Sequence, residues 1–151
     1  MEKDCLDKEL LKGLARRYEA ASFEVNRTMK HLMRSSMLAD ITTEQFSIMR
    51  YLNRMGKSTS SELADSFCVG KSSITAIITR LSDKGLVVRE PDDKDRRVTF
   101  LRLSPEGERL CNLMESDAYE ILSKFIKAME EEEAIAFIGT FEKLAARLRE
   151  S

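Results

Sequence analysis

Residues 59–97, TSSELADSFCVGKSSITAIITRLSDKGLVVREPDDKDRR, form the stretch that decides the fold. The pattern predicts a short helix, a tight turn, a second helix over residues 71–84 and then a hairpin with a charged loop. The second helix carries apolar residues spaced i, i+3, i+4 and i+7, at Ile74, Ile77, Ile78 and Leu81. This spacing puts them on one helix face, which we expect to pack on the preceding helix at Leu63, Ala64 and Phe67.

The opposite face of the second helix carries mostly short side chains, at Ser72, Ser73, Thr75, Ala76, Thr79 and Arg80. A solvated face usually carries long charged residues, whereas short hydroxyls with one arginine suit a helix lying in a groove of DNA; an ordinary amphipathic surface helix is the alternative. The two serines of the first turn can take phosphate oxygens, and Lys71 is a further candidate DNA-binding residue. The threonines and Ala76 can approach base edges or a thymine methyl group, while Arg80 can reach a guanine or a phosphate.

The hairpin is expected from two β-rich runs, residues 86–89 and 98–103, joined by a charged loop that ends in Asp95, Arg96 and Arg97. Mutual solvation of these charges is one interpretation. However, two adjacent arginines of an extended strand cannot both point the same way. One of them can project towards a narrow minor groove while Asp95 hydrogen-bonds and orients it or its neighbour.

The composition limits the alternatives. A chain of 151 residues with 42% hydrophobic and 34% charged residues fits one globular domain, or a small domain with helical extensions. We find no signal-like or membrane-length apolar run, and therefore expect a cytoplasmic protein without a membrane partner. Three cysteines (Cys5, Cys68 and Cys111) and a single histidine allow neither a disulfide framework nor a usual zinc site. No nucleophile, paired carboxylate or metal cluster appears at useful spacing, so we expect neither an enzyme nor a cofactor.

The charge is segregated along the chain, although the net charge is only −1. Residues 56–103 carry nine Lys/Arg and seven Asp/Glu, whereas residues 104–151 carry six Lys/Arg and eleven Asp/Glu. The acidity therefore lies in the C-terminal third, and the overall charge does not argue against nucleic-acid binding by the middle of the chain.

Long helices flank the central stretch. Apolar residues at heptad-like spacing predict one helix over residues 7–35, at Leu11, Leu14, Tyr18, Ala21, Val25, Met29 and Leu32. Two more helices are expected over residues 105–128 and from residue 130 onward, the last with Ile135, Ile138, Phe141, Ala145 and Leu148 pointing inward. We expect these seams to pack on one another, within one chain or between two chains.

Helix boundaries are marked by capping residues. Thr42 and Gln45 suggest a capping box for a helix that runs to about Arg54, and Gly56 fits its end. Thr59 and Glu62 predict a second capping box. Gly70 fits an N-cap, and Ser104 before Pro105 fits another. The resulting order is helix, helix, turn, helix and two-stranded wing, which is that of a winged helix-turn-helix.

Six short motifs, taken in order and spacing, resemble the MarR family of bacterial transcriptional regulators. They are Thr43-x-Gln45-Phe46, Thr59-x-x-Glu62-Leu63-Ala64, Val69-x-x-Ser72-Ser73-Ile74-Thr75, Arg80-Leu81-x-x-Lys84-Gly85-Leu86-Val87-x-Arg89, Asp95-Arg96-Arg97 and Leu103-Ser104-x-x-Gly107. The resemblance implies a mainly α fold with a small β-hairpin wing. A winged helix-turn-helix lobe would span residues 41–103, and residues 1–40 and 104–151 would form a helical dimerisation region.

The resemblance also implies a function. Members of the family are homodimers that bind double-stranded DNA at a pseudo-palindromic operator, usually as repressors, and the resemblance implies the same for this chain. Their recognition helices, here residues 71–84, would lie in successive major grooves and the wing arginines in the flanking minor grooves. Regulation by a small aromatic or anionic effector is implied, in a pocket drawing on residues such as Tyr18, His31 or Arg50. Ala76 departs from many relatives, which carry arginine or another polar residue there, so this helix is expected to make fewer base contacts.

Two alternatives stay open at this point. One is a regulator that responds to cysteine oxidation, although the reactive cysteine of the peroxide-sensing branch would match a position near Tyr18 rather than Cys5. We expect Cys68 to be a small core residue and Cys111 to pack in the core or an interface. The other alternative is a winged-helix module that binds protein and not DNA.

Overall fold

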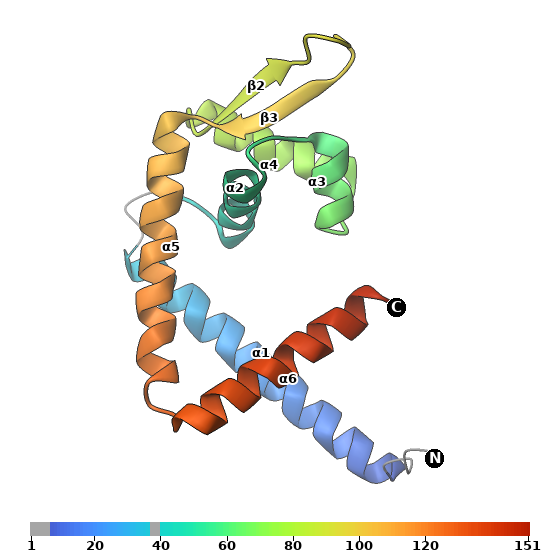
Figure 1. The fold of residues 1–151 in the computed structure, drawn as a ribbon, viewed down its shortest axis with the longest axis vertical. Helices are drawn as coiled ribbons and strands as arrows, with labels where there is room; N and C mark the ends of the chain where they lie inside the picture. Colours follow the sequence, from blue (N-terminus) through green and yellow to red (C-terminus); the bar gives the residue numbers. More distant parts are fainter. Residues whose placement is uncertain (1–6, 37–39) are drawn as a thin grey trace. The chain divides into compact units, whose positions relative to one another are not determined.

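The computed structural model describes residues 7–36 and 40–151, which contain six helices and three strands (Figure 1). The helices are α1 (Lys8–Ser36), α2 (Thr43–Met55), α3 (Ser60–Ser66), α4 (Lys71–Asp83), α5 (Pro105–Ile126) and α6 (Glu131–Arg149). The strands are β1 (Ser58–Thr59), β2 (Val87–Pro91) and β3 (Thr99–Leu103). The chain forms two compact units that divide between Thr43 and Glu44, so that α1 belongs to the first and all other elements lie chiefly in the second.

The core of the second unit lies among α2, α3, α4, the sheet and the first turns of α5. Its fully buried side chains are Ile48, Met49, Leu52, Leu63, Ile74, Ile78, Leu81, Leu101 and Cys111. At roughly 1.5–3 kcal/mol for each large apolar side chain removed from water, this cluster fixes how α4 crosses α3. The predicted contacts between these two helices are confirmed, with Phe67 half-buried against Tyr51 and not fully enclosed.

The sheet has three antiparallel strands in the order β1-β3-β2. The predicted two-stranded wing is confirmed as the β2–β3 hairpin. The sequence did not predict the third strand, in which Ser58 and Thr59 pair with Leu101 and Phe100. A strand of two residues is too short to show alternation in the sequence, and its second residue is also the cap of α3. Because β1 pairs with the middle of β3, the wing is tied directly to the start of α3.

Predicted capping residues mark the starts of α3, α4 and α5, while the capping box predicted at Thr42 and Gln45 stays a prediction. The Thr59 hydroxyl accepts from the Glu62 N–H at 3.2 Å, and the Glu62 carboxylate accepts from the Thr59 N–H at 2.7 Å, so this capping box is confirmed. The Thr59 N–H chiefly, and then the Ser58 hydroxyl, lower the pKa of Glu62 by donating to its carboxylate. Gly70 is the N-cap of α4 and Ser104 that of α5, as predicted.

A tight junction joins β3, α5 and the end of α4. Gly85 has a φ of +72° and lets the chain leave α4. Ser104 then donates from its N–H to the Leu86 carbonyl at 2.9 Å and from its hydroxyl to the Gly85 carbonyl at 2.6 Å. The same hydroxyl accepts from the Gly107 N–H at 3.0 Å. Gly107 is needed here, because a Cβ at this position would lie 2.1 Å from the Leu86 carbonyl oxygen.

The flanking helices expose the seams that the sequence predicted. Ile135, Ile138, Phe141, Ala145 and Leu148 were expected to point inward, but they are exposed, and no residue of α6 is buried in the described chain. Leu11, Leu14, Tyr18 and Val25 of α1 are exposed as well. The periodicity was predicted correctly, and the other elements of the second unit do not cover the apolar face of α6. None of the described helices is long and apolar enough to cross a membrane.

Candidate nucleic-acid interface

The turn between α3 and α4 spans residues 67–70, from the C-cap of α3 to the N-cap of α4. Cys68 takes a φ of +52°, and its N–H donates to the Asp65 carbonyl at 3.2 Å, while the Val69 N–H donates to the Ala64 carbonyl at 3.1 Å. Cys68 is exposed, so the expectation of a core residue was wrong. The helix end demands a left-handed residue here, and this backbone directs the side chain outward in spite of its apolar neighbours.

The helix α4 has one buried and one open face. Ile74, Ile78 and Leu81 are buried and Ile77 is half-buried, as the spacing predicted. All seven candidate residues of this helix are exposed: Lys71, Ser72, Ser73, Thr75, Ala76, Thr79 and Arg80. The N-cap, Gly70, makes no side-chain hydrogen bond to the first turn. The first N–H groups of α4 can therefore be offered to an anion beside the two serines.

Two of the hydroxyl groups on this face are already engaged. Thr75 Oγ1 donates to the Lys71 carbonyl at 2.8 Å, within the helix. Its proton is thus used, so this hydroxyl can only accept from a base. Thr79 Oγ1 accepts a long hydrogen bond of 3.5 Å from Nη2 of Arg89, on β2.

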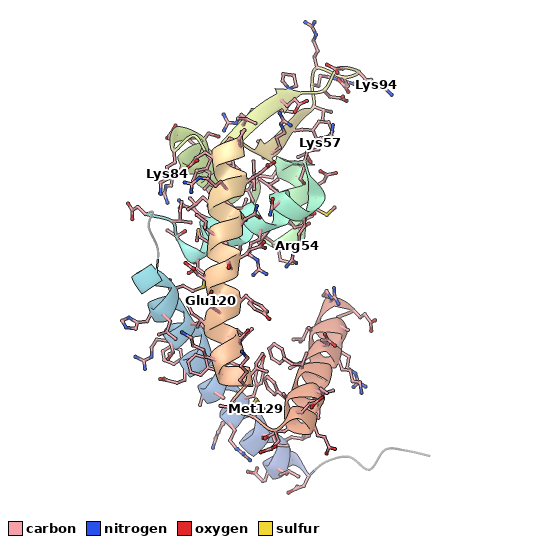
Figure 2. All side chains as sticks on the ribbon, turned by 60° about the vertical axis from the view of Figure 1, so that its left-hand side comes forward. Arg54, Lys57, Lys84, Lys94, Glu120 and Met129 are labelled. Carbon is pink, nitrogen blue, oxygen red and sulfur yellow. The ribbon has the colours of Figure 1, made fainter. Side chains whose placement is uncertain are left out.

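The loop of the hairpin holds one arginine in a fixed orientation. Asp95 accepts from the Arg97 N–H at 3.0 Å, from Nε at 3.1 Å and from Nη2 at 3.1 Å. The side-chain bonds chiefly, and then the backbone bond, lower the pKa of Asp95. The Arg97 side chain is nevertheless 91% exposed, against 39% for that of Asp95. Of the two adjacent arginines, it is Arg97 that the carboxylate orients, on a hairpin whose tip carries Lys94 (Figure 2).

Arg89, part of one of the family motifs but without a predicted role, lies exposed beside α4. Alternation along β2 puts it on the same sheet face as Val87, which is buried, and opposite Leu101 in the register. Glu90 points to the other face, where it pairs with Arg102 at 3.2 Å. The strand alternation could have identified Arg89 as the arginine turned towards α4.

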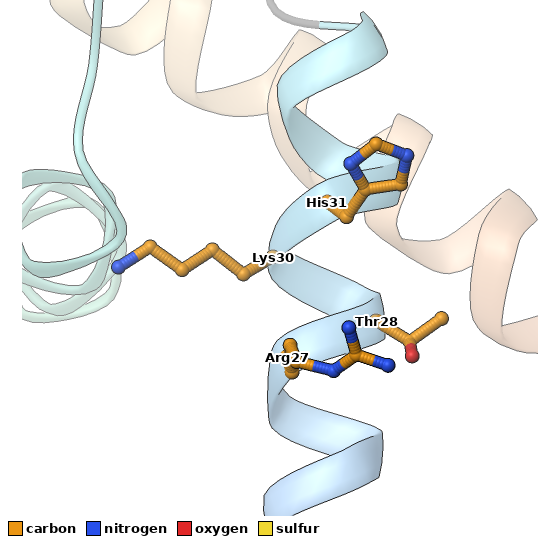
Figure 3. A pocket seen from close by; sticks show the side chains of 4 residues that line it. All are labelled: Arg27, Thr28, Lys30 and His31. Carbon is orange, nitrogen blue, oxygen red and sulfur yellow. The ribbon is translucent and has the colours of Figure 1, made fainter.

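A second basic group lies on α1. Arg27, Thr28, Lys30 and His31 line a hollow there (Figure 3). Arg27 is paired with Glu24 at 2.6 Å, and Lys30 extends away from the other three side chains. Tyr18 and His31 belong to the first unit, whereas Arg50 belongs to the second and pairs with Glu115 of α5 at 3.1 Å. The effector pocket implied by the resemblance stays a prediction.

The two described cysteines differ in burial, since Cys68 is exposed and Cys111 is buried. Cys111 is buried within the α5 contact with the lobe, as expected. Burial, and then the negative charge of Glu115, raise its pKa to about 11, although Arg50 and Arg54 oppose this. It is therefore a thiol at neutral pH and a poor nucleophile. Cys5 lies outside the described residues, so its role stays a prediction.

Comparisons with known proteins agree with this geometry. A family model described as the MarR family matches residues 41–99. The HTH-type transcriptional regulator FarR of Neisseria gonorrhoeae is 42% identical over 72 residues, which cover 48% of this chain and 49% of FarR. The uncharacterized HTH-type transcriptional regulator YsmB of Bacillus subtilis is 33% identical over 109 residues, which cover 72% of each chain. The chain thus spans about half the length of FarR and nearly three quarters of YsmB.

A solved structure supports the fold. A MarR mutant from E. coli, crystallised as a complex with operator DNA, matches with a TM-score of 0.73 at 21% identity, over 93% of this chain and 99% of that one. The fold and the exposed polar face of α4 define a winged helix-turn-helix protein. The sequence matches identify the family within this class: the chain belongs to the MarR family. It is a DNA-binding transcriptional regulator and not an enzyme.

Proposed function

We propose that this protein is a homodimer that binds a pseudo-palindromic operator and represses the genes next to it. The observation that carries the proposal is the pairing, on one lobe, of the open polar face of α4 with an arginine held outward by Asp95. An α-helix fits the major groove of B-DNA, and an extended arginine fits the minor groove. One lobe can therefore engage two neighbouring grooves of the same duplex.

In this proposal the start of α4 positions the protein and its middle reads bases. Lys71, Ser72 and Ser73 bind phosphates together with the first N–H groups of the helix. The apolar surface of Thr75 and Ala76 meets thymine methyl groups, and Arg80 reaches a guanine or a phosphate. Within the described ranges no carboxylate lies at ion-pair distance from Arg80, so its charge is available to DNA.

The wing supplies the second point of contact. Holding Arg97 in place before binding removes part of the side-chain entropy that an unrestrained arginine would lose on entering the groove. Lys94 and Arg96, in the same loop between β2 and β3, add positive charge for the flanking phosphates. Arg97 is thus the minor-groove residue, and Asp95 is the residue that positions it.

Dimerisation follows from the uncovered apolar faces. Residues 1–40 and 104–151 form the dimerisation region, where Phe125, Ile135 and Leu148 are 55%, 66% and 64% exposed in one chain. Large side chains at helical spacing on such faces are the usual signature of a partner surface. Two lobes joined by this region would contact half-sites about 34–36 Å apart, one turn of the duplex.

Repression and its relief complete the proposal. A dimer seated over a promoter excludes polymerase, and its chromosomal target puts it in the cytoplasm. A small aromatic or anionic effector that prefers one spacing of the two lobes would shift the population away from the DNA-binding form. Oxidation of a cysteine is the alternative signal. The burial of Cys111 weighs against that residue, since its pKa is raised to about 11.

The test is binding to the DNA upstream of the protein's own gene, by fluorescence anisotropy over a range of salt concentrations. Operator binding should be tighter than binding to random duplex and should weaken steeply with salt, because phosphate contacts release counterions. Weak or absent binding to both duplexes would instead favour a protein-interaction module. Sedimentation should give a dimer at micromolar concentration, and a stable monomer would contradict the role given to the flanking helices.

A further inference from the structure

Arg89 lies where the recognition helix and the wing meet. It belongs to β2, on the sheet face that carries the core residues Val87 and Leu101, but it is itself exposed at the edge of that core. From there its guanidinium reaches Thr79 of α4, with Nη2 at 3.5 Å from Oγ1. This is a long hydrogen bond, so it places the guanidinium beside α4 without using up its donors.

Two other arginines of the wing differ from Arg89, because each of them is paired with a carboxylate. Arg102, on the opposite sheet face, is neutralised by Glu90 at 3.2 Å, and Arg97 by Asp95 at 3.1 Å. In the described ranges no carboxylate forms an ion pair with Arg89, whose only side-chain partner there is a neutral hydroxyl. Four further N–H donors and a full positive charge are thus available beside the proposed DNA-reading surface.

The geometry of DNA decides what this charge meets. In the proposed complex α4 occupies the major groove and the hairpin tip the neighbouring minor groove. One sugar-phosphate strand separates any two neighbouring grooves, so this strand must cross the protein between α4 and the hairpin tip. Arg89 and Thr79 lie at that crossing, because they join the two elements.

We propose that Arg89 is a phosphate-binding residue that grips the strand between the two grooves, an inference that rests on the DNA-binding function proposed above. A guanidinium fork binds two oxygens of one phosphate. The contact carries no base information, and it fixes the depth to which α4 and the wing enter their grooves together. Thr79 then acts as a positioning residue for Arg89, with its methyl group left to face the bases.

The test compares Arg89→Gln with Arg102→Gln, which removes an arginine from the neighbouring strand on the opposite sheet face. A dimer that loses two phosphate contacts should show a plot of log K against log[salt] that is shallower by about 1.8, at about 0.9 for each phosphate. If the difference vanishes near 1 M salt, Arg89→Gln should bind about sixtyfold more weakly at 0.1 M. Arg102→Gln should keep the wild-type slope, and Arg89→Lys should retain most of it.

Two readouts separate this role from others. The ratio of operator to random-duplex affinity should stay constant in Arg89→Gln, since a phosphate contact is blind to sequence. A scan of operators with one neutral methylphosphonate should find a position that weakens the wild type and leaves Arg89→Gln unaffected. A wild-type slope in Arg89→Gln, or no such position, would overturn the inference while DNA binding by the wild type stands. A wild type without operator binding would overturn the proposed function itself.

Discussion

Replacing Gly107 by alanine tests the junction that connects the wing to α5. The new Cβ would lie 2.1 Å from the Leu86 carbonyl oxygen and 3.0 Å from its carbon, both backbone atoms without a flexible end. An ordinary carbon–oxygen contact needs more than 3 Å, so either α5 or the end of α4 must move by about 1 Å. That movement would stretch the hydrogen bonds of Ser104 to Gly85 and Leu86, which are 2.6 and 2.9 Å long.

The size of the effect follows from three contributions. Forced overpacking of a buried site costs about 1–3 kcal/mol. Weakened hydrogen bonds at the junction cost about 1 kcal/mol each, while alanine gains up to about 1 kcal/mol over glycine in a helix. We therefore expect Gly107→Ala to lower the free energy of unfolding by about 2–3 kcal/mol.

The assay is urea denaturation followed by circular dichroism, at one fixed protein concentration because the protein is proposed to dimerise. Gly13→Ala is the matched control. Gly13 lies inside α1, and a Cβ there would meet no atom within 4 Å. This control should leave stability unchanged or raise it by up to about 1 kcal/mol. A Gly107→Ala protein as stable as the wild type would refute the close approach of α5 to Leu86.

Further predictions concern the wing, a buried thiol and the operator. Asp95→Ala should weaken operator binding about threefold to tenfold, although it removes a negative charge, because Arg97 loses its orientation; tighter binding would mean that charge alone governs the wing. Cys111 keeps its proton in the folded protein up to a pKa of about 11, above its ordinary 9.0. Its contribution to stability is complete below pH 9 and lost as the pH rises through 11, so wild-type melting temperatures should fall more over this range than those of Cys111→Ala. Uracil in place of the thymine that meets Thr75 and Ala76 should lower affinity about fourfold, the effect of one methyl group, and an operator insensitive to every such replacement would contradict methyl readout.

The helix boundaries could be predicted because they depend on local chemistry. Thr59 with Glu62 and Ser104 before Pro105 each satisfy the free N–H groups of a helix start from within four residues. The buried face of α4 follows from spacing alone in the same way. Capping and spacing patterns of this kind involve only residues that are close in the sequence, so they can be identified without the structure.

Other features depend on partners that are distant in the chain. The pairing of Ser58 with Leu101 is a tertiary contact with no local signature. Cys68 has apolar neighbours that favour burial, but the backbone of the helix end overrides them. Alternation along β2 indicates the sheet face on which Arg89 lies, but its contact with Thr79 depends on how β2 packs on α4.

The exposed apolar helix faces show a third limit of prediction from sequence. Periodicity identified the apolar face of α6, but it cannot say whether the covering surface belongs to the same chain. Ile135 and Phe141 remain exposed in one chain, so the partner of this face must be sought outside the elements that form the lobe. A sequence pattern defines a face, whereas a structure defines what covers it.

Hydroxyl-radical footprinting on the DNA upstream of the gene tests the central claim most directly. We predict two protected regions related by two-fold symmetry, about one helical turn apart, with flanking minor-groove protections contributed by Arg97. Arg97→Ala should lose the flanking protections and bind about 1–3 kcal/mol more weakly, while the central protections remain at higher protein concentration. A wild-type protein that leaves this DNA unprotected at low salt, or an Arg97→Ala footprint identical to that of the wild type, would contradict the account.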